Sequence, residues 1–89
     1  MHTEIDNVVC IIADKVVGMA MSHSIKETIK AVYPLIEENK DILATMPDYT
    51  MDVYFGLLFD IVDANEVSDI EYVHTVYDAV GGVMIHTIY

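Results

Sequence analysis

Arginine is absent from the chain, and its four lysines stand against fifteen aspartates and glutamates. The formal net charge is −11 at pH 7. Proteins that hold nucleic acid neutralise its phosphates with Lys and Arg, so this composition argues against direct nucleic-acid binding and, for the same reason, against attachment to anionic lipid. Such a charge favours a basic surface on a partner protein. The alternative is that the charge only keeps a small apolar protein soluble.

Cysteine and long apolar runs are scarce as well. With a single cysteine, Cys10, no internal disulfide can form. Because Cys10 lies in the apolar run 8–12, we expect a buried, unreactive thiol in a reducing compartment. The uncharged runs 16–25 and 79–89 are too short to span a bilayer, and Glu4 and Asp6 occupy the place of a basic signal-peptide leader. These absences predict a cytoplasmic protein without a membrane segment.

Sequence signatures of catalysis and of cofactor binding are missing too. No serine lies in a Gly-x-Ser-x-Gly turn, and Gly81-Gly82 precedes no Lys-Ser or Lys-Thr pair of a phosphate loop. We therefore expect no enzyme and no cofactor. Glu71 and His74 form one Glu-x-x-His pair, with Asp78 a turn further on, whereas di-iron bundles use that pair twice. A metal-binding helical bundle is kept as an alternative, and we assign no metal ligand.

Apolar residues are abundant for a chain of this size. Hydrophobic residues make up 54% of the 89 residues, and the mean hydropathy is +0.39. A chain of this length forms one domain, residues 1–89, and a domain this small buries a limited share of its surface. Either the core is unusually apolar or another chain covers part of the surface.

The spacing of the apolar residues predicts four helices, over about 3–22, 24–45, 48–63 and 68–89. Short connections favour antiparallel neighbours, so we expect an all-α fold, a small up-down four-helix bundle. The first helix is apolar over more than half of its circumference, which predicts a homo-oligomer, most simply a dimer.

Local signals mark the ends and irregularities of these helices. Ser24 and Glu27 have the spacing of a capping box, and Ser68 and Glu71 repeat it. Pro34 cannot donate a backbone hydrogen bond, so we expect the second helix to be kinked at Pro34. Gly81-Gly82 predicts fraying or a bend in the last helix, and the β-branched tail 83–89 leaves a strand as the alternative there.

The third helix carries the main candidate site. At about 100° per residue, its four aspartates and Gly56 share a sector of roughly 120°, with Phe59 inside it and Tyr49 at its border. An acidic stripe around an aromatic ring is typical of a protein-binding face, because charge steers the encounter and the ring anchors it. The alternative is that a neighbouring helix or a second subunit covers Phe59 and that the aspartates are only solvated. The candidate protein-binding residues are Asp48, Tyr49, Asp52, Phe59, Asp60 and Asp63.

Carboxylates along a helix can also imitate the phosphates of a nucleic acid, so a basic nucleic-acid-binding groove would accept this stripe. In composition, the small, very acidic chain without cofactor motifs resembles phage or mobile-element proteins that bind and inhibit host factors. That resemblance implies an inhibitor or nucleic-acid mimic. The competing hypothesis is a self-assembling structural module, which the wide apolar sector of the first helix favours.

Overall fold

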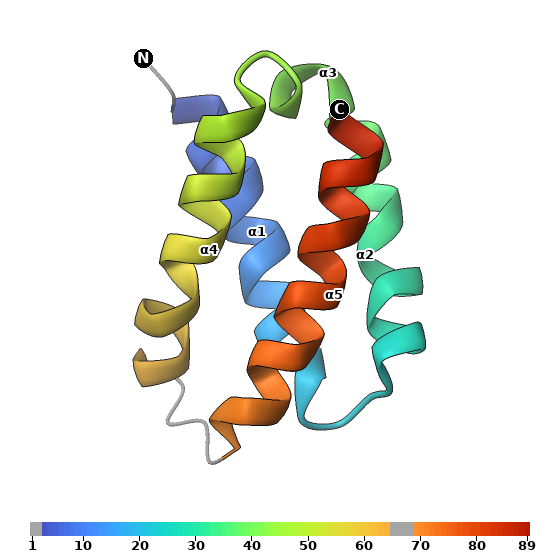
Figure 1. Ribbon diagram of the computed structural model, residues 1–89, viewed down its shortest axis with the longest axis vertical. Helices are drawn as coiled ribbons and strands as arrows, with labels where there is room; N and C mark the ends of the chain where they lie inside the picture. The colour runs from blue at the N-terminus through green and yellow to red at the C-terminus, as the bar shows by residue number, and fades with distance from the viewer. Residues whose placement is uncertain (1–2, 65–68) are drawn as a thin grey trace.

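The computed structural model describes residues 3–64 and 69–89, and every regular element in those ranges is a helix. α1 spans Thr3–Ala20, α2 spans Ile25–Glu38, and the short α3 covers Lys40–Leu43. α4 spans Pro47–Ala64 and α5 spans Ile70–Ile88 (Figure 1). The predicted all-α class is confirmed, with five helices in the described ranges in place of the predicted four.

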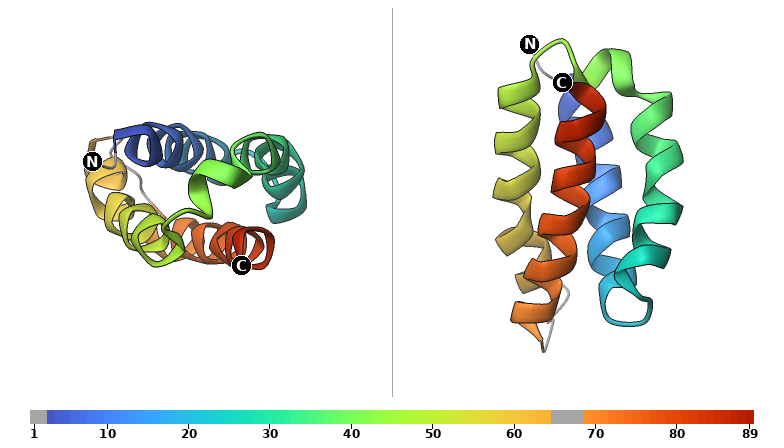
Figure 2. Two further views of the ribbon diagram at one scale, coloured as in Figure 1. Left: turned by 90° about the horizontal axis from the view of Figure 1, so that it is seen from above. Right: turned by 45° about the vertical axis from the view of Figure 1, so that its right-hand side comes forward.

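The four long helices lie in two layers. Seen from above, α1 and α2 form one layer, and α4 and α5 form the other (Figure 2). α1 and α5 each contact all three other long helices. Consecutive long helices run in opposite directions, as their short connections require (Figure 1). Because the molecule measures 34 × 24 × 15 Å, each layer presents one broad outer face.

α1 contributes a large share of the core, because it touches helices on three sides. Its buried side chains recur at the helical spacing expected for one inward face. They are Ile5, Val9, Ile12, Ala13, Val16, Val17 and Ala20.

The prediction that Cys10 is buried is wrong. Five consecutive residues of a helix turn through about 400°, so the apolar run 8–12 cannot all face inward. Val9 and Ile12 are fully buried, whereas Cys10 and Ile11 are exposed, Ile11 by 57%. The run therefore supplies both the core and the surface of α1.

The capping box that opens α2 is confirmed. The Ser24 hydroxyl oxygen accepts from the N–H of Glu27 at 3.1 Å, and the Glu27 carboxylate accepts from the N–H of Ser24 at 3.2 Å. The bond from the Ser24 backbone, helped by the Ser24 hydroxyl, lowers the pKa of Glu27, because hydrogen bonds to a carboxylate favour its charged form.

A single kinked helix reaching Thr45 was predicted, but the chain forms two helices there. α2 runs through Pro34 to Glu38 and ends at Asn39, and α3 follows as a separate turn. Pro34 is exposed, so water can satisfy the carbonyl that its missing N–H leaves without a partner. The side-chain amide of Asn39 donates to the Leu35 carbonyl at 2.8 Å and so satisfies an acceptor of the last turn.

The last two helices begin at residues suited to a helix start. α4 begins at Pro47, where the missing N–H is not needed and the ring presets φ. α5 is capped by Asp69, whose carboxylate accepts from the N–H of Tyr72 at 3.0 Å. Ser68, the first residue of the predicted second capping box, lies outside the described residues. α5 continues without interruption through Gly81-Gly82 to Ile88, so the tail is a helix and the strand alternative is wrong.

Two buried tyrosines join α4 to α5. The Tyr54 hydroxyl donates to the main-chain oxygen of Tyr77 at 2.8 Å, and the Tyr77 hydroxyl donates to that of Tyr54 at 2.5 Å. Their rings stack with centroids 4.1 Å apart, and both side chains are fully buried. Burial raises the pKa of both hydroxyls far above the usual value, because a phenolate here would lose its hydration. The pair fixes how α4 and α5 lie against each other.

Candidate protein-binding face

The predicted acidic stripe lies on the outer side of α4. The carboxylates of Asp48, Asp52, Asp60 and Asp63 are all exposed. Gly56 lies among them with open space where a side chain would be. The stripe is therefore a solvent-facing acidic surface with a gap at its middle.

Phe59 lies within this stripe and is 61% exposed. Its only described ring neighbour is His74 of α5, at a centroid distance of 5.3 Å in an edge-on arrangement. Within the described chain no helix covers the ring. The alternative that a neighbouring helix covers Phe59 is therefore wrong. An aromatic ring left open among carboxylates is the feature expected of an anchor residue.

Tyr49 has a different role from the other candidate residues. It is half-buried, and its hydroxyl donates to Oδ1 of Asp6 in α1 at 2.6 Å. This hydrogen bond raises the pKa of Tyr49, because ionisation would remove the donor and set two anions side by side. Tyr49 thus ties α4 to α1 at the edge of the stripe.

α5 contributes side chains to the same face, which the sequence did not reveal. The Tyr89 hydroxyl donates to Asp48 across the two helices, and this raises the pKa of Tyr89. Phe55 of α4 lies on Gly81, where a Cβ atom would come within 2.6 Å of the ring. We define the α4–α5 face as a set of solvent-accessible residues of these two helices, namely Asp48, Asp52, Phe55, Phe59, Asp60 and Asp63 of α4 with His74, Asp78, Gly82, Ile85 and Tyr89 of α5 or its end.

Charge is distributed unequally between the two layers. All four lysines precede Pro47, and the region from Pro47 onward contains eight of the fifteen acidic residues with no Lys or Arg. The α4–α5 layer therefore carries negative charge without any cationic side chain of its own. The eight acidic residues in this part of the sequence are Asp48, Asp52, Asp60, Asp63, Glu66, Asp69, Glu71 and Asp78.

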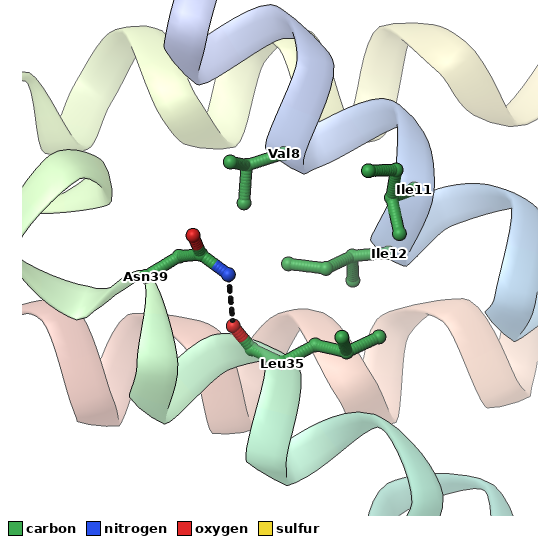
Figure 3. A pocket seen from close by; sticks show the side chains of 5 residues that line it. All are labelled: Val8, Ile11, Ile12, Leu35 and Asn39. Atoms are coloured by element: carbon green, nitrogen blue, oxygen red, sulfur yellow. Dashed lines mark hydrogen bonds between the residues drawn. The ribbon is translucent and has the colours of Figure 1, made fainter.

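The other layer contains a small apolar pocket between α1 and the end of α2. Val8, Ile11 and Ile12 line it from α1, and Leu35 and Asn39 line it from the opposite side (Figure 3). The pocket encloses about 270 Å³, part of which is open to solvent. Its only polar lining group, the Asn39 side chain, is already bonded to the Leu35 carbonyl, so the pocket offers a hydrophobic contact and little directed chemistry.

The described residues contain no group of three or more His, Cys, Asp or Glu side chains arranged to hold a metal ion. Glu71, His74 and Asp78 therefore do not form such a group, although they share one helix. In the same part of the chain, no helix combines the length and the apolar character needed to cross a bilayer.

Comparison of the chain with protein-family models, with curated proteins and with solved structures finds no match.

Proposed function

We propose that this chain is a non-enzymatic interaction protein that binds a basic surface of a partner protein through its α4–α5 face. The main support is the exposed Phe59 surrounded by aspartates in a layer that has no Lys or Arg. Complementary charge raises the rate of encounter, and an open aromatic ring supplies contact area at low entropic cost. Phe59 is the most exposed aromatic side chain within the described helices.

A partner that normally binds nucleic acid fits this surface best. Its groove is already lined with Lys and Arg, and carboxylates along α4 can take the places of phosphates. Occupying that groove would block nucleic-acid binding, so the chain would act as an inhibitor by mimicry.

The test is affinity capture of partners from lysate of the source cell with the wild type and with the variant D52N/D60N/D63N. We expect the wild type to retain a basic protein at low salt and to release it at high salt, because the attraction between exposed charges is screened. The neutralised variant should retain none of that protein.

The matched control is E4Q/D14N/E38Q, which removes the same charge from exposed positions of α1 and α2. Capture by this control should equal that of the wild type. If both variants capture the same protein as the wild type, the acidic face is not the binding site and its charge only aids solubility.

Self-association is the second candidate function, and a different surface favours it. Ile11 is 57% exposed beside the apolar pocket on α1, where a second copy of the chain could cover it. This surface lies in the layer that contains Lys15, Lys26 and Lys30, so pairing there brings together less net charge than pairing through α4 and α5.

A further inference from the structure

A strip of exposed apolar side chains follows the line where α4 meets α5. Phe59 is 61% exposed, Ile85 is 42% exposed and Phe55 is 37% exposed. Phe55 and Phe59 lie one turn apart on α4, and Ile85 lies on α5 between Gly81 and Tyr89. Apolar side chains grouped in this way on a soluble protein mark a surface that contacts a partner.

The contacts between the helices set the level of each side chain along the strip. The Tyr89 hydroxyl reaches Asp48 and the Phe55 ring lies on Gly81, so Ile85, between Gly81 and Tyr89, faces the part of α4 between Asp48 and Phe55. Phe55 and Phe59 follow at an interval of four residues, or about 6 Å at the helical rise of about 1.5 Å per residue. The strip thus runs in the order Ile85, Phe55 and Phe59, and residues i, i+3 and i+7 on one face of an α-helix likewise follow one another about one turn apart.

Acidic and small residues complete the strip. Asp52 and Asp63 border it on α4, and Asp78 borders it on α5; all three are exposed. Gly82 lies one turn after Asp78 on the outer side of α5, with open space above it. The missing side chain allows another backbone to come close beside Ile85.

We propose that this strip is the docking site for a basic amphipathic helix of the partner, an inference that rests on the proposed function. The helix places apolar side chains at i, i+3 and i+7 against Ile85, Phe55 and Phe59. Its flanking Lys and Arg side chains pair with Asp52, Asp63 and Asp78. An extended peptide adds to the edge of a sheet, and the described residues offer no strand to receive one.

The test uses two labelled synthetic peptides of about 18 residues with identical Leu and Lys content. One has Leu at i, i+3 and i+7 and forms a helix with one apolar face; the other has its residues permuted so that no such face forms. Binding to the full chain is followed by fluorescence anisotropy at low salt. We expect the helical peptide to bind at least tenfold more tightly than the permuted one.

Two variants of the chain locate the site. Phe59→Ala should weaken binding of the helical peptide about tenfold, whereas Ile11→Ala, an exposed position on the opposite layer, should leave it unchanged. Gly82→Gln should block close approach without changing charge, and Gly18→Gln is its control on α1, since both glycines have open space around them. Circular dichroism and thermal melting show whether each variant is folded.

The outcomes separate this inference from the proposed function. Both peptides could bind equally, with D52N/D63N/D78N abolishing the binding of both. The face would then attract basic chains without selecting a helix. That result overturns the docking of a helix, while the proposed function stands. If the helical peptide binds but neither Phe59→Ala nor Gly82→Gln weakens it, the docking site is elsewhere. If neither peptide binds at low salt, the inference and the proposed function are both overturned.

Discussion

At the scale of single residues, Tyr54 and Tyr77 hold α4 and α5 against each other. Each hydroxyl donates to the main-chain oxygen of the other residue, and the stacked rings fill the contact between the helices. Apolar spacing placed both tyrosines on inward faces, but it could not show that they bond to each other. That pairing depends on the relative level of two helices, which no local pattern encodes.

We predict that the tyrosine pair makes stability fall at alkaline pH. Both pKa values are raised in the folded chain, so above about pH 10 the unfolded chain loses these protons while the folded chain keeps them. The free energy of unfolding should then fall by about 1.4 kcal/mol per pH unit for each such tyrosine. Urea denaturation between about pH 9 and 11.5 measures this slope.

The variant Tyr54→Phe isolates one member of the pair. It keeps the stacked ring, loses one hydrogen bond and should lower stability at neutral pH by about 1 kcal/mol. Above about pH 10, the free energy of unfolding of this variant should fall less steeply with pH than that of the wild type. Equal slopes in the two proteins would show that Tyr54 ionises as freely in the folded chain as in the unfolded one.

The candidate site residues also differ in how far the sequence could identify them. The four aspartates and Phe59 share one helix, so their common face followed from helical periodicity. Helical periodicity within α4 gives no sign that Phe55 and Ile85 belong to the face, because they join it only when α4 lies against α5. Tyr49 borders the predicted stripe, yet its hydroxyl donates to Asp6 of α1.

At the scale of helices, the glycines show how the same residue type meets different surroundings. Gly18 of α1 is exposed with nothing near it, whereas Gly81 of α5 is covered by Phe55. A Cβ atom at Gly81 would lie 2.6 Å from Cζ of Phe55 and 3.3 Å from Cε2 of Tyr54. Phe55 is half-exposed and can move, but the buried Tyr54 ring cannot.

We predict opposite outcomes for alanine at these two glycines. Gly18→Ala should stabilise the chain by about 0.5–1 kcal/mol, because alanine favours the helix and meets no atom. Gly81→Ala should give no such gain and should destabilise the chain, since Phe55 must move and the tyrosine pair is crowded. Thermal melts of the two variants make the comparison, and a higher melting temperature for Gly81→Ala than for Gly18→Ala would contradict the contact described at Gly81.

At the scale of the whole molecule, the charge is divided between two layers. The α1–α2 layer holds three of the four lysines and the apolar pocket, Lys40 lies in α3, and the α4–α5 layer holds acids without lysine. The two broad faces of the slab therefore suit different partners. In our proposals, a second copy of this chain covers the first face and a basic partner binds the second.

The oligomeric state tests the first face. If copies pair through α1, light scattering at micromolar concentration should give a mass twice that of the 10.0 kDa chain, because Ile11 and the pocket are then covered. Ile11→Asp should return the chain to a monomer, whereas Ile85→Asp, on the acidic face, should leave the dimer intact. A wild-type monomer at this concentration would remove the basis for the self-association candidate.

The sequence by itself determined the all-helical class, the capping box at Ser24 and the acidic side of α4, because each depends on residues within a few turns of one another. The tertiary structure decided which residues of the apolar run 8–12 reach the core, since the surrounding helices cover only part of α1. It also decided that Phe55 and Phe59 of α4 lie against residues of α5. These features depend on how two segments distant in the sequence lie against each other, and that arrangement is set by packing rather than by local preference.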